Sequence, residues 1–150
     1  MQYYALPNAA NRLGQSKGQL IGGNLRTLEN LAGTESELET ENKILFLEEV
    51  DEQLYNIDRM FWNLKRTGKL DKLAGLVIGG FKIKPDAPED DKFSLDLQQI
   101  VLEKTKDTSY PICFDFPVGH QINNYALKCG CIHELNVAAS GTILTEWREA

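Results

Sequence analysis

A short run of apolar residues that ends in acid constrains the fold of this chain more than any other stretch. Residues 44–47 are all apolar, and Glu48 and Glu49 follow them directly. An uninterrupted apolar run of this length is typical of a strand buried on both faces, as in a parallel sheet. We therefore expect a strand over 44–47 with Glu48 at its carboxyl end, the edge of an open α/β sheet where ligands and catalytic groups collect.

The following segments extend this strand into a parallel crossover. Apolar residues recur at the spacing of an amphipathic helix, namely Leu54, Ile57, Met60, Phe61 and Leu64. Residues 73–80 then have the composition of a second buried strand, so that a right-handed parallel unit is expected. Further along we expect a surface excursion over 82–92, a helix over 95–102 capped by Ser94, a strand over 111–116 and an antiparallel hairpin between 132–136 and 142–147.

His120 is the candidate partner of Glu48. A bare carboxylate at a buried strand end is costly to desolvate unless another group stabilises it. His120 follows the expected strand over 111–116 and therefore reaches the same edge of the sheet. In such a pair the carboxylate accepts from one imidazole nitrogen and leaves the other nitrogen free to remove a proton. The alternative is that His120, which follows Gly119 in a loop, is an ordinary surface residue.

A glycine pair precedes the first expected helix. The polar segment 8–18 leads to Gly22 and Gly23, and Asn24 is then a good N-cap for a helix that ends near Gly33. The backbone N–H groups of Gly23 and Asn24 could receive a substrate carboxylate at this helix start. The simpler interpretation is a tight turn followed by a capped helix.

The cysteines offer a second cluster with possible chemistry. Cys129, Cys131 and His133 alternate along an expected strand, with Cys113 conceivably adjacent, and thiolates with an imidazole could hold zinc. A flat strand, however, spreads alternate side chains by roughly 7 Å, which is too far for convergence on one ion. Free cysteines that behave as small hydrophobic residues are therefore the expectation, and no metal site is predicted.

Composition excludes several classes of function. The 150 residues carry a net charge of −6, and the 16 basic residues are scattered among 22 acidic ones, so no nucleic-acid surface is expected. No apolar stretch approaches the ~18 residues of a membrane span, and the first residues lack the pattern of a signal peptide. Cysteine usage without a disulfide framework fits a reducing compartment, so a cytoplasmic protein is expected.

Five motifs, in order along the chain, resemble those of the LD-carboxypeptidase (muramoyltetrapeptide carboxypeptidase) family. They are Gly-Gly-Asn-Leu at 22–25, Ile-Leu-Phe-Leu-Glu-Glu at 44–49, Tyr-Asn-Ile-Asp-Arg-Met at 55–60, Leu-Ala-Gly-Leu-Val-Ile-Gly-Gly-Phe at 73–81 and Phe-Pro-Val-Gly-His at 116–120. The resemblance implies a serine peptidase with a Ser-Glu-His triad, in which Glu48 and His120 are the catalytic Glu and His. Glu49 is the rival for the first position, although the motif favours Glu48.

The resemblance also implies a fold and a domain organisation. The family's C-terminal domain is similar to the swivelling β/β/α fold, an α/β domain with a parallel sheet, a smaller antiparallel sheet or hairpin and flanking helices. We expect residues 1–150 to form this single domain, with 1–23 as the connection between domains. The N-terminal domain that carries the serine nucleophile in the family has no counterpart in this sequence.

The function implied by the resemblance is removal of the terminal D-alanine from cytoplasmic murein tetrapeptides during peptidoglycan recycling. A homodimer without metal or organic cofactor is expected, and the isolated chain is expected to be inactive because it lacks the nucleophile. Two alternatives are a microcin-immunity-type peptidase that cleaves peptide-nucleotide antibiotics, and a non-catalytic binding domain of the same fold.

Overall fold

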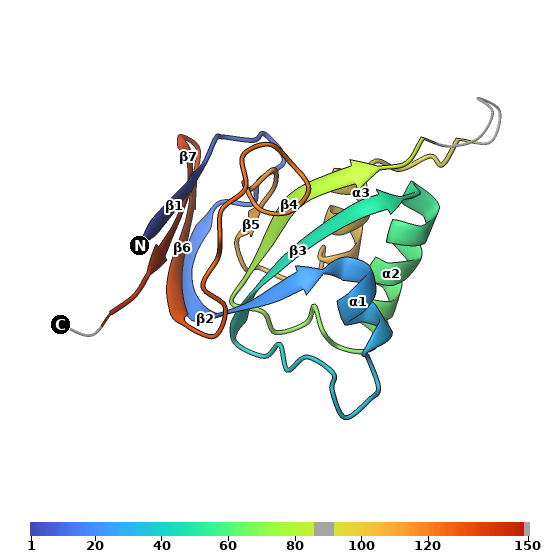
Figure 1. Ribbon diagram of the computed structural model, residues 1–150, viewed down its shortest axis with the longest axis horizontal. Coiled ribbons are helices and arrows are strands. Elements are labelled where there is room, and N and C mark those ends of the chain that lie inside the picture. Colours follow the sequence, from blue (N-terminus) through green and yellow to red (C-terminus); the bar gives the residue numbers. More distant parts are fainter. Residues whose placement is uncertain (86–91, 149–150) are drawn as a thin grey trace.

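The computed structural model describes residues 1–85 and 92–148, in which one seven-stranded sheet is packed against helices (Figure 1). The strands are β1 (Gln2–Ala5), β2 (Gly14–Asn24), β3 (Lys43–Glu52), β4 (Gly75–Ile83), β5 (Ile112–Cys113), β6 (Ile132–Ala138) and β7 (Gly141–Glu146). The helices are α1 (Leu25–Asn30), α2 (Leu54–Arg66) and α3 (Leu97–Lys104). The strand order in the sheet is β1-β7-β6-β2-β3-β4-β5.

Strand β2 joins two halves of the sheet that differ in strand direction. Residues 14–19 pair antiparallel with β6, whereas residues 19–24 pair parallel with β3. β7 pairs antiparallel with both β6 and β1, while β3, β4 and β5 are parallel to one another. Figure 1 shows the antiparallel strands beside the N-terminus and the helices against the parallel strands. The predicted α/β fold, with a parallel sheet, a smaller antiparallel part and flanking helices, is confirmed.

Alternation along β3 builds two apolar cores, one on each face of the parallel strands. Leu45 and Leu47 belong to the core that also contains side chains of α2 and α3. Ile44 and Phe46 belong to the other core, which includes residues of β1, β6 and β7, namely Tyr3, Leu135, Val137 and Leu144. Burial on both faces explains why the sequence of this strand is apolar without interruption.

The helices confirm the predicted apolar stripe but change one predicted cap. The buried residues of α2 are Ile57, Met60, Phe61 and Leu64, as the helical spacing predicts. α3 begins after Asp96 rather than after Ser94, so the predicted cap is wrong. The Asp96 side chain accepts a hydrogen bond from Gln99 N, and the Gln99 side chain accepts one from Asp96 N. This reciprocal capping box satisfies two backbone donors at once.

Three strands differ in extent from the sequence-based expectations. β3 continues past Glu48 to Glu52, because β4 also continues and Val50 pairs with Lys82. β2 begins inside the polar segment 8–18, since hydrogen bonds to its neighbours compensate for the missing apolar pattern. β5 is shorter than the predicted 111–116, because only two of its residues pair with β4.

The amino-terminal residues are part of the sheet. Residues 1–23, expected as a connection between domains, contain β1 and most of β2, and their role as a connection stays a prediction. The predicted surface excursion over 82–92 lies largely outside the described residues, which exclude 86–91. None of the helices in the described residues is long and apolar enough to cross a membrane.

Candidate active site

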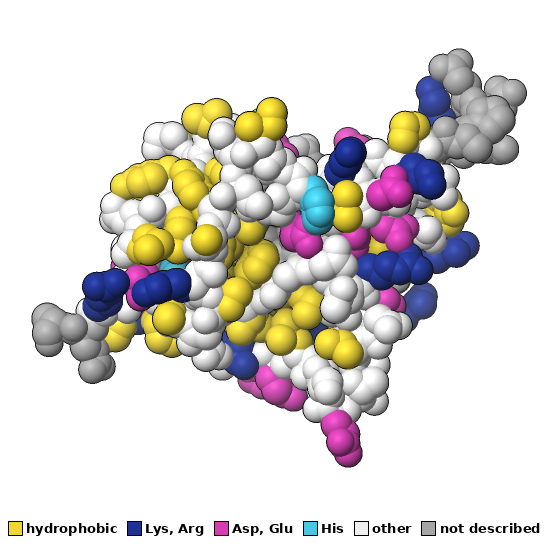
Figure 2. Space-filling view, viewed as in Figure 1, with side chains coloured by type: hydrophobic (Ala, Val, Ile, Leu, Met, Phe, Trp, Pro, Cys, Tyr) yellow, Lys and Arg dark blue, Asp and Glu magenta, His cyan; other side chains and the backbone are white. Residues whose placement is uncertain are grey.

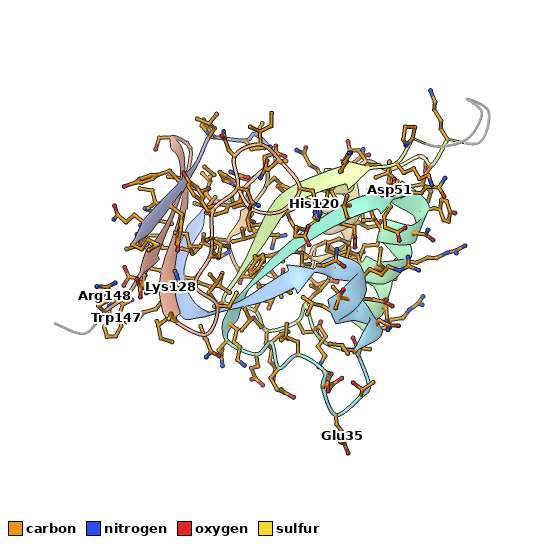
Figure 3. All side chains as sticks on the ribbon, in the orientation of Figure 1. Glu35, Asp51, His120, Lys128, Trp147 and Arg148 are labelled. Atoms are coloured by element: carbon orange, nitrogen blue, oxygen red, sulfur yellow. The ribbon has the colours of Figure 1, made fainter. Side chains whose placement is uncertain are left out.

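Glu48 and His120 meet at the carboxyl edge of the parallel strands. The distance between His120 Nδ1 and Glu48 Oε2 is 2.6 Å. The Glu48 side chain is 12% exposed, whereas the His120 side chain is 48% exposed. Figures 2 and 3 show this imidazole at the surface beside β3 and β4, next to acidic side chains and far from Lys128 and Trp147. The predicted contact between the two residues is confirmed, and their catalytic role stays a prediction.

This contact determines how His120 can take part in proton transfer. The Nδ1–H group donates to the Glu48 carboxylate, so the neutral ring carries its proton on Nδ1 and a lone pair on Nε2. Within the described residues, Nε2 has no hydrogen-bond partner. The imidazole can therefore accept a proton from a group that approaches from the solvent side.

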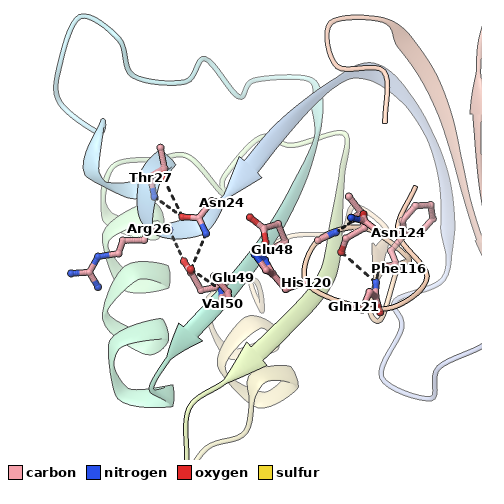
Figure 4. Close-up of polar contacts among 12 residues, drawn as sticks. Asn24, Arg26, Thr27, Glu48, Glu49, Val50, Phe116, His120, Gln121 and Asn124 are labelled. Carbon is pink, nitrogen blue, oxygen red and sulfur yellow. Dashed lines mark hydrogen bonds and ion pairs between the residues drawn. The ribbon is translucent and has the colours of Figure 1, made fainter. Parts of the chain in front are cut away.

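Glu49 points to the opposite face of β3 and is fully engaged there. It is 3% exposed, and its carboxylate accepts hydrogen bonds from Asn24 Nδ2 at 2.8 Å, Arg26 N at 2.9 Å and Val50 N at 2.9 Å (Figure 4). Successive side chains of a strand point to opposite faces, so only one of the two glutamates can reach His120. Glu49 instead ties the start of α1 to β3.

Glycines bring the loop that carries His120 close to Glu48. The register between β3 and β4 shifts here, so that Gly79 and Gly80 both lie opposite Glu48. Such bulges are frequent next to active sites. A Cβ atom at Gly79 would lie 2.5 Å from Val118 O, and one at Gly119 would lie 2.5 Å from Glu48 Cβ. Gly119 also has a φ of +97°, which favours glycine, so the Gly-His sequence is a geometric requirement.

Gly23 and Asn24 lie at the end of β2, where Asn24 is in register with Glu48. The predicted cap is confirmed, because Asn24 Oδ1 accepts a hydrogen bond from Thr27 N at 3.0 Å. The same side chain donates to Glu49, so both ends of its amide are occupied. A Cβ atom at Gly23 would meet no other atom within 4 Å, so the backbone is open to approach there. Substrate binding by Gly23 and Asn24 stays a prediction.

The cysteines and the second histidine do not converge. Within 1–85 and 92–148, no group of three or more His, Cys, Asp or Glu residues is placed to hold a metal ion. Burial raises the pKa of Cys113 to about 11, so this thiol is protonated and unreactive at neutral pH. Burial also lowers the pKa of His133, whose Nδ1 lies 3.1 Å from Cys131 O.

Two amide side chains that the sequence reasoning did not single out hold the loop that carries His120. Asn124 Oδ1 accepts a hydrogen bond from Gly119 N at 3.0 Å, and Gln121 Nε2 donates to Phe116 O at 2.6 Å (Figure 4). The available signal was the polar segment 121–124 directly after the histidine. Such a segment indicates a turn but not which backbone groups its side chains bind.

Comparison with known proteins points to one family. A family model described as the LD-carboxypeptidase C-terminal domain matches residues 17–135. A Bacillus subtilis protein named probable murein peptide carboxypeptidase is 34% identical over 131 residues, which are 87% of this chain and 40% of that protein. The microcin C7 self-immunity protein MccF of Escherichia coli is 37% identical over 67 residues, which are 44% of this chain and 20% of that protein.

A solved structure supports the same relationship. The crystal structure of muramoyltetrapeptide carboxypeptidase from Oxalobacter formigenes superposes with a TM-score of 0.81 at 26% identity. The alignment covers 99% of this chain and 49% of that one. The chain therefore spans less than half the length of each of these three proteins.

Proposed function

Because the chain belongs to the LD-carboxypeptidase family, matching that family's C-terminal domain, we propose that it supplies the Glu and the His of a Ser-Glu-His triad. The observation that carries this proposal is the 2.6 Å contact between Glu48 and His120 at the carboxyl edge of the parallel strands. A buried carboxylate that orients a half-exposed imidazole is the arrangement that a general base requires.

The proposed reaction is hydrolysis of an amide bond by acyl transfer. A serine hydroxyl gives its proton to His120 Nε2 as its oxygen attacks the carbonyl carbon that precedes the terminal D-alanine. The imidazolium, stabilised by Glu48, then gives this proton to the D-alanine nitrogen, and the C–N bond breaks. Water, deprotonated by the same imidazole, then attacks the acyl-serine ester. The ester C–O bond breaks, the imidazolium returns its proton to the serine oxygen, and the shortened peptide is released.

We place the nucleophilic serine on the N-terminal domain of the family. Within the described residues, no hydrogen bond joins a serine to His120. Ser16 lies in the antiparallel half of β2, paired with Leu135, and Ser109 precedes β5 at the opposite edge of the sheet. The remaining serines, Ser36, Ser94 and Ser140, lie in loops and turns outside the named elements. The isolated chain is therefore expected to be inactive.

The proposed substrate is a murein tetrapeptide, cleaved in the cytoplasm during peptidoglycan recycling. The names of the Bacillus subtilis and Oxalobacter formigenes proteins support this substrate class. Open backbone at Gly23, beside the strand that carries Glu48, is the proposed place for the substrate carboxylate, with Asn24 at the same strand end.

A second candidate substrate class is a peptide-nucleotide antibiotic. The similarity to the self-immunity protein MccF, 37% identity over 67 residues, favours it as the alternative. The chemistry at Glu48 and His120 would be the same for both classes. A non-catalytic binding domain is the third possibility, and it predicts that neither residue matters for activity.

Release of D-alanine from a murein tetrapeptide tests the proposal. The 150-residue chain alone is expected to release none, and a two-domain protein, in which this chain is combined with an N-terminal domain of the family, is expected to release it. Cleavage of a peptide-nucleotide antibiotic but not of the tetrapeptide would favour the second class. Turnover by the chain alone would contradict the placement of the nucleophile.

We also propose that the protein forms a homodimer. Large apolar side chains are exposed near the His120 loop, with Ile122 fully exposed and Leu6 85% exposed. Exposed apolar surface of this kind favours association. Sedimentation should detect a dimer of the chain, and a strict monomer at high concentration would contradict this proposal.

A further inference from the structure

The loop that carries His120 is not held by a regular sheet ladder. β5 ends at Cys113, and between it and β6 the chain has no helix or strand. Two hydrogen bonds tie this loop to β4, from Phe116 N to Ile78 O at 3.0 Å and from Gly80 N to Val118 O at 2.7 Å. An isolated parallel bridge also pairs Gly80 with Gly119, so β4 restrains the backbone as far as Gly119. The residues that follow Gly119 depend on contacts within the loop.

Two side chains that follow His120 in the sequence, Gln121 and Asn124, make further hydrogen bonds within this loop. Asn124 Oδ1 accepts from Gly119 N at 3.0 Å (Figure 4). Gln121 Nε2 donates to Phe116 O at 2.6 Å and to Val118 O at 3.3 Å. Gln121 N also donates to Gly119 O at 3.0 Å, which closes a tight turn centred on His120.

Gly119 transmits this restraint to the candidate catalytic pair. Its backbone lies so close to the Glu48 side chain that an added Cβ atom would be 2.5 Å from Glu48 Cβ and 3.0 Å from Glu48 Cγ. A rotation of the peptide that precedes Gly119 would therefore move the following imidazole relative to the carboxylate. The Asn124 acceptor is the side-chain group bound to the N–H of this peptide.

We propose that Asn124 is a positioning residue for His120: through Gly119 it keeps Nδ1 of the imidazole on Glu48 and leaves Nε2 free. The proposal rests on the proposed function, in which Nε2 accepts the serine proton. Positioning of a reacting group to within about 1 Å is worth roughly 100-fold in rate, so a group that sets this position matters without touching the substrate.

The chain offers a matched control and an internal reference. Asn123 is an adjacent asparagine that is also exposed, and no side-chain hydrogen bond of it is found in the described structure. The sequence has two histidines, so imidazole nitrogen spectra contain one reference signal, that of buried His133. Asn124→Asp keeps an oxygen acceptor at the position of Oδ1, whereas Asn124→Ala removes it.

The test is nitrogen NMR of the two imidazoles in the 150-residue chain, at a pH where both rings are neutral. In the unmodified chain and in Asn123→Ala, His120 should carry its proton on Nδ1. In Asn124→Ala the signal should shift toward the Nε2–H form that free imidazole prefers, and Asn124→Asp should restore it. Hydrogen exchange of the Gly119 amide, measured in the same samples, should accelerate at least about tenfold in Asn124→Ala alone.

An unchanged His120 tautomer and unchanged Gly119 exchange in Asn124→Ala, with the His133 signal intact, would overturn the proposal. In the two-domain protein, Asn124→Ala should lower kcat by about 10- to 100-fold with little change in KM, and Asn124→Asp should recover most of it. His120→Ala distinguishes the proposed catalytic role of His120 from its positioning by Asn124. If it leaves kcat unchanged, the proposed function fails, while the tautomer measurement still decides the positioning by Asn124.

Discussion

Glu48 and Glu49 are adjacent on β3, yet their two faces of the sheet are built differently. Glu49 points to the helix side, where three donors from α1, its cap and β3 occupy its carboxylate. Glu48 points to the other side, where its hydrogen-bond partner among the described residues is the half-exposed His120. Regular elements enclose the first carboxylate, whereas a loop supplies the partner of the second.

The difference indicates how one strand can carry both a structural and a reactive acid. A buried carboxylate whose hydrogen bonds are all made by fixed backbone and side-chain donors contributes to stability. A carboxylate whose partner is a titratable side chain at an open edge can stabilise the charge that this partner gains when it accepts a proton. Variants of Glu48 should therefore mainly lower activity, whereas variants of Glu49 should mainly lower the free energy of unfolding.

The largest expected effect is on activity when Glu48 is changed. Glu48→Gln in the two-domain protein should lower kcat by about 10³- to 10⁴-fold, because the imidazole loses the anion that orients it and stabilises its protonated form. Steady-state D-alanine release measures this loss. Glu49→Gln is the matched control and should retain most of the activity. A larger loss of kcat in Glu49→Gln than in Glu48→Gln would contradict the assignment of Glu48 as the reactive acid.

Glu49→Ala is the next largest change and should reduce stability. It leaves Asn24 Nδ2, Arg26 N and Val50 N without their acceptor in a partly buried environment, which costs about 2–3 kcal/mol in the free energy of unfolding. Urea unfolding of the 150-residue chain measures the difference. Glu48→Ala should cost clearly less, and equal losses for the two variants would show that the two faces are not distinct.

Gly119→Ala should affect the open face alone. The added Cβ atom would lie 2.5 Å from Glu48 Cβ, at a φ of +97°, so the loop must move and separate His120 from Glu48. We expect kcat to fall by about 10- to 100-fold in the two-domain protein. Gly130→Ala is a useful control, because it has a similar φ of +87° but no atom within 4 Å of the added carbon. Equal activity losses in the two variants would point to backbone strain rather than the contact.

The smallest expected effect concerns His133, which is buried on β6 in the antiparallel half of the sheet, away from the Glu48–His120 pair. Burial lowers the pKa of His133, so as pH falls below about 6.5 the unfolded chain binds a proton that the folded chain does not. The free energy of unfolding should therefore decrease from pH 7.5 to pH 5.5. Urea unfolding at both pH values measures it, and His133→Phe should reduce this decrease. If His133→Phe shows the same pH dependence as the unmodified chain, the loss of stability at low pH does not come from His133.

The parallel part of the molecule followed from local sequence pattern. The apolar run at 44–47, the helical spacing from Leu54 to Leu64 and the second run near 75 were sufficient, because each element is buried on a predictable face. β2 was not predictable in full, since its first half is polar and is stabilised by β6, which lies more than a hundred residues away in the sequence. Propensity carries no information about such a partner.

The candidate site was predictable as a pair but not as a geometry. The acid after an apolar run and the Gly-His sequence identified Glu48 and His120, and strand alternation separates Glu48 from Glu49 once the register is known. The roles of Gln121 and Asn124 depend on where a loop folds back on itself. Side-chain hydrogen bonds to backbone in an irregular loop have no period, so sequence spacing could not reveal them.

The close approaches at Gly79 and Gly119 have a genetic consequence. Every replacement of a glycine adds at least one carbon atom, and at both positions that atom would lie 2.5 Å from a neighbour in or beside the pair. No missense change at either codon is neutral by this geometry. In a saturation mutagenesis survey these positions should therefore tolerate as little as Glu48 and His120, although neither carries a reactive group.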